Sequence, residues 1–138
     1  MREILFRGKR LDTGEWILGG LIKVKIGKVT ALVIFNPDFA FINGEVKSLD
    51  HANVDPATVG QYTGLQDKNG KKIFEGDIWD CGGCIGVIKW EEVICSFEAH
   101  YVMHGIEYAN AVSDYRAAKV EVIGNIHDNP ELIGGDTP

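Results

Sequence analysis

Long hydrophobic runs are missing from this 138-residue sequence. The longest, such as Ala31–Phe35, fall far short of the roughly 18 apolar residues that a membrane-spanning helix needs. The first residues show no basic segment followed by an apolar one, so we expect no signal peptide. Three cysteines cannot build a disulfide framework, because an odd number leaves one unpaired. These absences argue against a membrane protein and a disulfide-rich secreted domain, and they predict a protein of the reducing cytoplasm.

Signatures of the common enzyme classes are also missing. The sequence has no phosphate-binding loop of the G-x-x-x-x-G-K-[ST] type and no dinucleotide-binding fingerprint. Its three serines, Ser48, Ser96 and Ser113, all lie outside the context of a nucleophile elbow. We therefore predict that the protein is not an enzyme, and we assign no catalytic, cofactor-binding or metal-binding residue.

Short alternating strands separated by tight turns dominate what is present. Trp16–Ile26 ends in strict alternation, with lysines at 23 and 25 facing away from the apolar side chains. Gly27-Lys28 predicts a hairpin turn into Val29–Phe35, and Gly19-Gly20 predicts a bulge or a close backbone approach. Further strands are predicted over Arg2–Arg7, Phe39–Leu49 (two strands around an Asn43-Gly44 turn), Thr58–Leu65, Lys71–Phe74, Ile78–Cys81, Gly86–Trp90, Val93–Val102 and Lys119–Ile126.

The segments between these strands have the composition of turns. Asp67 to Gly70 and Glu75 to Asp77 predict tight turns in which Asp67 and Asp77 accept nearby backbone N–H groups. Non-strand structure is expected at Asn36–Asp38 (end of a hairpin), Asp50–Ala57 (a polar connection), Glu107–Lys119 (a weak helical candidate), Asn129–Leu132 (a helical turn) and Gly134–Pro138 (a frayed tail).

The polar connection is the one candidate lobe boundary, and charge is distributed unevenly around it. We predict an N-terminal β lobe over residues 1–57 and a second lobe over 58–138, with one continuous domain as the alternative. Residues 1–59 hold eight Lys/Arg and seven Asp/Glu, a net charge of +1, whereas residues 60–138 hold six and thirteen, a net charge of −7. The acidic half should repel nucleic-acid phosphates.

Four stretches of the sequence carry a family pattern. They are MREI…FR at the N-terminus, QYTGLQDKNGKKIFEGDI at Gln61–Ile78, GVIKW at Gly86–Trp90 and VIGNI…NPEL at Val122–Leu132. In these stretches the chain resembles the YopX family of phage and prophage proteins. This resemblance implies a mainly β fold with an SH3-like small barrel in the C-terminal part, and it supplies no catalytic or ligand residue to carry over. We therefore expect an N-terminal β-hairpin region packed on an SH3-like barrel, with at most short helices.

Cys81-Gly-Gly-Cys84 is the sharpest local motif, and three interpretations are open. Two glycines between two cysteines are typical of a hairpin turn. Zinc is the second interpretation, with further ligands from Cys95, His100 or His104, although the spacing fits no standard finger or ribbon. A redox motif normally stands at a helix N-terminus in a βαβ context, which this sequence lacks.

Other polar groups give weaker signals. Glu91, Glu92 and Glu98 allow an acid/base pair, but a solvated strand edge is the simpler interpretation. The histidines, His51, His100, His104 and His127, are scattered.

One basic cluster, together with aromatic residues to stack on bases, is the pattern of small barrels that bind nucleic acid. Its members are Arg2, Arg7, Lys9, Arg10, Lys23, Lys25 and Lys28, and the aromatics are Trp16, Tyr62, Trp79 and Trp90.

Two functions are therefore weighed. We expect a non-enzymatic accessory protein of the bacterial host cytoplasm that binds a host or phage protein, with nucleic-acid binding through the basic face as the alternative. Open strand edges also favour a homo-oligomer, and no membrane partner is expected.

Overall fold

The computed structural model describes residues 2–42 and 44–133, apart from the side chains at 37–42 and 45–49. The chain forms two compact units, Met1–Gln61 and Tyr62–Pro138, called here the N-terminal and C-terminal units. This division falls shortly after the predicted boundary at 57/58. Among the described residues, no helix has the length and apolar character that crossing a membrane requires.

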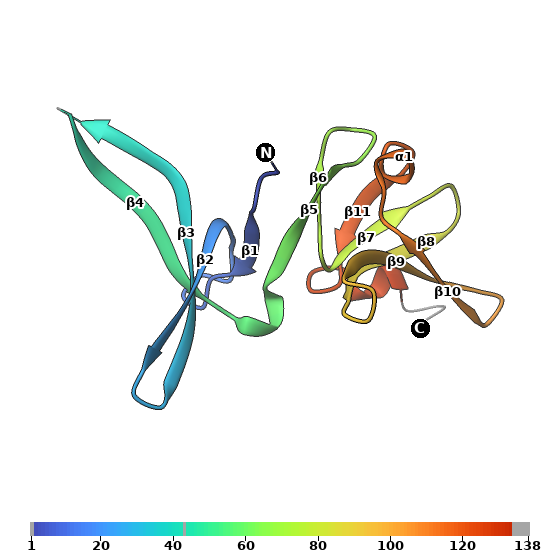
Figure 1. Ribbon diagram of the computed structural model, residues 1–138, viewed down its shortest axis with the longest axis horizontal. Coiled ribbons are helices and arrows are strands. Elements are labelled where there is room, and N and C mark those ends of the chain that lie inside the picture. Colours follow the sequence, from blue (N-terminus) through green and yellow to red (C-terminus); the bar gives the residue numbers. More distant parts are fainter. Residues whose placement is uncertain (1, 43, 134–138) are drawn as a thin grey trace. The chain divides into compact units, whose positions relative to one another are not determined.

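Antiparallel strands build the N-terminal unit (Figure 1), in the order β4-β3-β2-β1-β5. The first two residues of β5 pair with β1, and its later residues pair with β6 of the C-terminal unit. The elements are β1 (Phe6–Lys9), β2 (Trp16–Ile26), β3 (Val29–Ile42), β4 (Glu45–Val54), the 3-10 helix η1 (Pro56–Thr58) and β5 (Gly60–Gln66).

Gly19 marks the point where β2 changes its partner. Trp16 to Gly19 pair with β1, whereas Gly20 to Ile26 pair with β3. A Cβ atom on Gly19 would collide with the carbonyl group of Phe35, so no larger residue fits without a backbone shift. The predicted close backbone approach is confirmed at this glycine. The core of the N-terminal unit is small and is formed by Ile17 of β2, Ile34 of β3, and Ala52 and Val54 of β4.

A five-stranded antiparallel sheet in the order β10-β9-β8-β7-β11 is the main part of the C-terminal unit. No pairing joins β10 to β11 among the described residues, so the sheet is open and the SH3-like barrel is not confirmed. The mainly β class is confirmed. The elements are β6 (Lys72–Phe74), β7 (Asp77–Asp80), β8 (Ile85–Glu91), β9 (Ser96–Met103), β10 (Ile106–Ala111), α1 (Asp114–Ala117), β11 (Glu121–Asn125) and η2 (Pro130–Ile133).

Trp79 is the centre of the C-terminal core. Its indole is fully buried, and its Nε1–H donates to the Tyr101 hydroxyl at 2.9 Å. Gly86 lies between these two rings, because the strand register sets it opposite both residues. The cluster is completed by Ile73, Ile88, Ala99, Ala117, Val120 and Val122.

Several segments differ from the sequence-based expectation. Strand β3 does not end at Asn36–Asp38 but continues past it. The β3–β4 register shifts between Phe35 and Phe39, and this irregularity accommodates Pro37 within the strand. Asp50 to Val54 are not a loop, because they belong to β4, where His51 to Val54 pair with β3. Strand β1 begins only at Phe6. The helix expected over Glu107–Lys119 is confined to the single turn α1, and β10 takes up the first part of the range.

Other expectations have mixed outcomes. Strand β2 has the predicted bounds, and η2 begins at Pro130 as expected. Asn43 of the expected Asn43-Gly44 turn and the tail at 134–138 lie outside the described residues.

Candidate functional site

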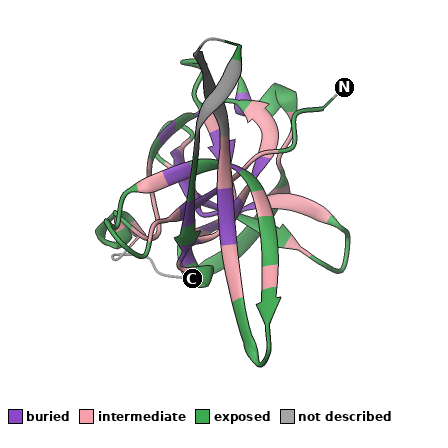
Figure 2. Cartoon of the chain, turned by 90° about the vertical axis from the view of Figure 1, so that its left-hand side faces the viewer, coloured by how far each residue is buried: buried purple, intermediate pink, exposed green. Residues whose placement is uncertain are grey.

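The β2–β3 hairpin presents one apolar face, called here the hairpin face and formed by Leu18, Ile22, Ile26 and Val29. These side chains are 37%, 48%, 73% and 68% exposed. Ile26 stands directly opposite Val29, so the face continues across both strands. Figure 2 shows the hairpin exposed at its tip and buried where β3 continues toward the core. The alternation of apolar and lysine residues that the sequence predicted is present, but its apolar side is largely uncovered.

The predicted basic cluster is partly neutralised within the N-terminal unit. Arg10 donates to both carboxylate oxygens of Asp12 at 3.0 and 3.1 Å and reaches Asp50 at 3.2 Å. The hydrogen bond from Arg10 is the main cause that holds the pKa of the Asp12 carboxyl below its usual value. Arg7 is nearly buried and lies over the Trp16 ring, 4.8 Å from its centroid. These two arginines therefore already contact protein groups. Nucleic-acid binding, the alternative function, would instead require them to contact phosphates.

The aromatic residues proposed for base stacking are mostly part of the cores. Trp79 is fully buried and Tyr62 is 7% exposed. Trp90 is half exposed but contacts Phe97 edge-on, with 4.9 Å between the ring centroids. Trp16 lies under Arg7, as described above. These four aromatic residues do not form an open stacking platform, which weakens the nucleic-acid interpretation.

Asp67 and Asp77 are turn-forming residues, as predicted. Asp67 accepts N–H groups from Asn69 and Lys71 at 2.8 and 2.9 Å, and from Val122 at 2.9 Å. Burial alone raises the pKa of the Asp67 carboxyl, but these three donors outweigh burial and hold the pKa below its usual value. Asp77 is buried and accepts the Phe74 N–H at 2.7 Å. Both carboxylates are therefore used by the fold.

The C-x-x-C motif forms the two-residue turn between β7 and β8. The Cys81 N–H donates to the Cys84 carbonyl at 3.0 Å, and both intervening glycines have positive φ. The Asp80 carboxylate accepts both glycine N–H groups at 2.9 Å. The hairpin interpretation is confirmed. The Cys81 side chain donates to the Cys84 carbonyl at 3.1 Å, and the Cys84 sulfur lies 3.5 Å from the Met103 sulfur.

The other ligands considered for zinc are not gathered around this turn. Cys95 belongs to the β8–β9 turn, at the opposite end of the seven-residue strand β8 and therefore about 23 Å away. His100 and His104 line a pocket of about 370 Å³ whose other walls include Cys84 and Met103. In residues 2–42 and 44–133, these histidines do not form a group of three metal-ligating side chains with Cys81 and Cys84.

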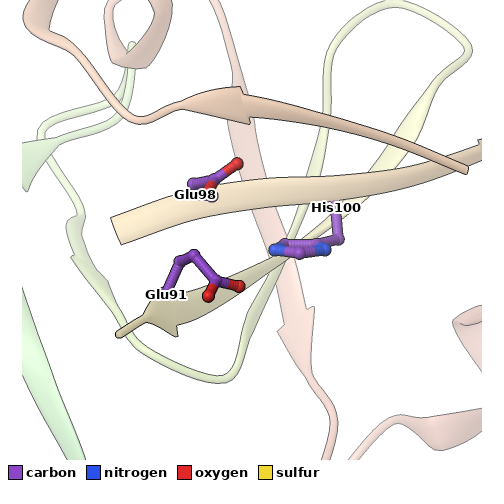
Figure 3. A group of neighbouring side chains, drawn as sticks. All are labelled: Glu91, Glu98 and His100. Carbon is purple, nitrogen blue, oxygen red and sulfur yellow. The ribbon is translucent and has the colours of Figure 1, made fainter. Parts of the chain in front are cut away.

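One group of hard ligands does come together, on β8 and β9 (Figure 3). A ligand atom from each of Glu91, Glu98 and His100 lies within 4.8 Å of the other two. Ligands around a tetrahedral ion are about 3.4 Å apart, so atoms separated by as much as 4.8 Å would have to close by at most about 1.4 Å. The Glu91 carboxylate also accepts the Val93 N–H at 3.3 Å, which ties it to the turn. The Nε2 atom of His100 is buried without a hydrogen-bond partner among the described residues. Sequence spacing did not indicate this group, because it depends on the β8–β9 register.

The chain is similar to a solved structure and to a protein family. The chain resembles the crystal structure of protein EF1440 from Enterococcus faecalis, with 24% sequence identity and a TM-score of 0.49 over 96% of this chain and 99% of that one. No curated protein matches the sequence. The family model described as YopX protein matches residues 5–134, nearly the whole chain. The chain therefore belongs to the YopX protein family.

Proposed function

We propose that this protein is a non-enzymatic accessory protein of a phage or prophage, and that it acts in the bacterial cytoplasm by binding another protein. The observation that supports the proposal is the hairpin face, an apolar surface on which the strongly exposed pair Ile26 and Val29 lies. Contiguous exposed apolar surface of this kind is typical of protein interaction sites.

The hairpin face lies on a part of the sheet that has no neighbouring strand, so a bound partner would stabilise it. Strand β1 pairs with β2 only as far as Gly19, and β4 pairs with β3 only from Leu32 onward. The tip, residues 24–31, is therefore a two-stranded ribbon, and isolated two-stranded hairpins are only marginally stable in water. Burying its apolar side chains would contribute about 25 cal/mol for each Å² removed from water.

The charge of the β2–β3 hairpin indicates what kind of partner surface is complementary to it. The β2–β3 segment from 16 to 35 contains Lys23, Lys25 and Lys28 and no acidic residue. Lys23 and Lys25 alternate with the apolar residues along β2, so they project from the opposite side of the two-stranded ribbon and stay exposed. The complementary partner is a protein with an apolar groove that receives the ribbon and has carboxylates at its edges, within reach of the long lysine side chains. Rim charges of this kind mainly raise the association rate and add specificity.

The test is site-specific photo-crosslinking in bacterial lysate. A photoreactive phenylalanine analogue replaces Ile26 in the full-length chain, and the crosslinked peptides are sequenced by mass spectrometry. We expect crosslinks to one protein, on apolar peptides flanked by Asp or Glu. The matched control carries the analogue at Val93, which is 89% exposed in the β8–β9 turn.

The purified partner is then titrated with wild-type and variant protein. Ile22→Glu together with Ile26→Glu should weaken binding by about a hundredfold or more, as for residues central to an interface, whereas Val93→Glu should leave it unchanged. Crosslinks from Ile26 to a second copy of this chain, crosslinks to nucleic acid, or the same proteins captured from both positions would overturn the proposal.

A further inference from the structure

We propose that Cys81, Cys84 and Met103 form a binding site for a soft monovalent metal ion, of which Cu(I) is the biological example. The site lies within the C-terminal unit and is independent of the hairpin face. Its donors are two thiols and one thioether, and soft sulfur ligands of this kind select Cu(I) over hard cations.

Strand register brings the three sulfurs together. Asp80 pairs with Ile85 across the β7–β8 turn, so Cys81 stands opposite Cys84. Gly86 pairs with Tyr101, and the same register continued by two residues sets Cys84 opposite Met103. Side chains at opposite positions of neighbouring strands share one face of the sheet. The three residues thus form a row, two positions beyond the buried row Trp79, Gly86 and Tyr101.

The distance between the sulfurs of Cys84 and Met103 is close to that around a ligated ion. Metal–thiolate bonds are about 2.3 Å long, which separates sulfur ligands of one ion by about 3.8–4.0 Å. The sulfurs of Cys84 and Met103 are already 3.5 Å apart, so ligation needs a shift of only a few tenths of an ångström. The Cys81 side chain is hydrogen-bonded at the same turn, to the carbonyl of Cys84.

The surroundings suit reversible binding of an ion. All three residues line one pocket of about 340 Å³, together with Tyr101 and Tyr108. Cys81 is exposed and Met103 is 41% exposed, so an ion can enter and leave. The turn itself is fixed by the Asp80 carboxylate, which accepts both glycine N–H groups and limits the movement of the two cysteines.

The thioether distinguishes this site from structural zinc. Zinc in structural sites takes four ligands from Cys, His or carboxylates. Among the described residues, no third ligand of those types joins Cys81 and Cys84. A three-sulfur set that includes methionine therefore favours Cu(I), which accepts low coordination numbers and thioether donors.

The test is an anaerobic titration of the reduced full-length protein with Cu(I), in competition with a chromophoric Cu(I) chelator. We expect one ion per chain and an ultraviolet absorption band from sulfur-to-copper charge transfer. Cys81→Ser and Cys84→Ser should each weaken Cu(I) binding by about a hundredfold or more, and Met103→Leu by about tenfold. The matched control is Cys95→Ser, which removes the exposed cysteine at the other end of β8.

Each outcome decides the proposal. Retained affinity in Cys95→Ser, with loss in the other three variants, supports it. Circular dichroism of every variant confirms that the fold is intact, and the conservative Met103→Leu change reports the thioether even where a cysteine variant unfolds. Equal loss in Cys95→Ser, an unchanged affinity in Met103→Leu, or a Cys81–Cys84 disulfide that resists reduced glutathione would overturn the site.

Discussion

The β2–β3 and β7–β8 hairpins both turn through glycine but have opposite environments. The second half of β2 alternates apolar residues with lysines, whereas β7 and β8 contain the adjacent apolar pairs Ile78-Trp79 and Val87-Ile88. On β7 and β8 the apolar residues Ile78 and Ile88 are at most 1% exposed, whereas Ile26 on β2 is 73% exposed. Alternation therefore identifies the faces of a strand, but it does not identify which face the rest of the molecule covers.

The difference comes from neighbouring strands. Strands β7 and β8 are flanked by β11 and β9, and Ala117 of α1 and Val120 complete the core above them. The tip of the β2–β3 hairpin extends beyond the residues of β2 that pair with β1 and beyond the residues of β3 that pair with β4. One hairpin thus belongs to the core, and the tip of the other leaves its apolar face uncovered. The predictions below test this contrast, from the largest expected effect on stability to the smallest.

Substituting one glycine in each hairpin should give the largest difference. A Cβ atom on Gly86 would lie 2.5 Å from Trp79 Nε1 and 2.7 Å from Tyr101 Cε1, whereas one on Gly20 would meet no atom within 4 Å. We expect Gly86→Ala to lower the free energy of unfolding by about 3 kcal/mol, because overpacking forces the two rings apart. Gly20→Ala should change it by less than about 1 kcal/mol. Urea unfolding of both variants measures this, and equal losses would contradict the contrast.

Asp67→Asn should have the second largest effect, about 2 kcal/mol at pH 7, because a charged acceptor of three N–H groups becomes neutral. The pKa of Asp67 is lowered in the folded protein. Its stabilisation is therefore present above the unfolded-state pKa of about 3.9 and is lost as pH falls through the folded-state value. Wild type and variant should converge in acid, as followed by urea unfolding at pH 7, 5, 4 and 3.

The matched control for this carboxylate is Asp80→Asn in the β7–β8 turn. Asp80 accepts two glycine N–H groups but lies nearer the surface, and it makes no bond to a distant strand like that from Asp67 to Val122. We expect its loss to be at most about half that of Asp67→Asn, because water can replace the exposed bonds. A larger effect at Asp80 would show that the turn, not the link to β11, carries the stabilisation.

Removing the Tyr101 hydroxyl should cost about 1–2 kcal/mol, because Tyr101→Phe leaves the buried indole N–H of Trp79 without its partner. Burial is the main cause that raises the pKa of Tyr101, so the hydroxyl stays neutral at ordinary pH and the loss should not vary between pH 6 and 8. Thermal unfolding across that range, with tryptophan fluorescence as the signal, checks both points. An unchanged melting temperature would show that the hydrogen bond is not formed in solution.

Local features were predictable from the sequence, whereas features that depend on register were not. The bounds of β2, the close approach at Gly19 and the Asp67 turn follow from alternation and from the conformational preferences of glycine and aspartate. The continuation of β3 beyond Pro37 depends on pairing with β4 that no local pattern indicates. Likewise, the C-x-x-C motif predicts that Cys81 and Cys84 face each other, but the approach of Met103 requires the β8–β9 register.

Ile26→Ala should have the smallest effect on stability, within about 0.5 kcal/mol, because its side chain is already in water in the free chain. The same substitution in a core normally costs about 2–5 kcal/mol, since it removes buried methyl groups and leaves a cavity. Urea unfolding of dilute protein measures the change, with light scattering to establish that the sample is monomeric. A loss above about 1 kcal/mol at all protein concentrations would mean that the chain itself covers the hairpin face. A loss that grows with protein concentration would instead show that a second copy covers it, because a self-associating interface stabilises by mass action.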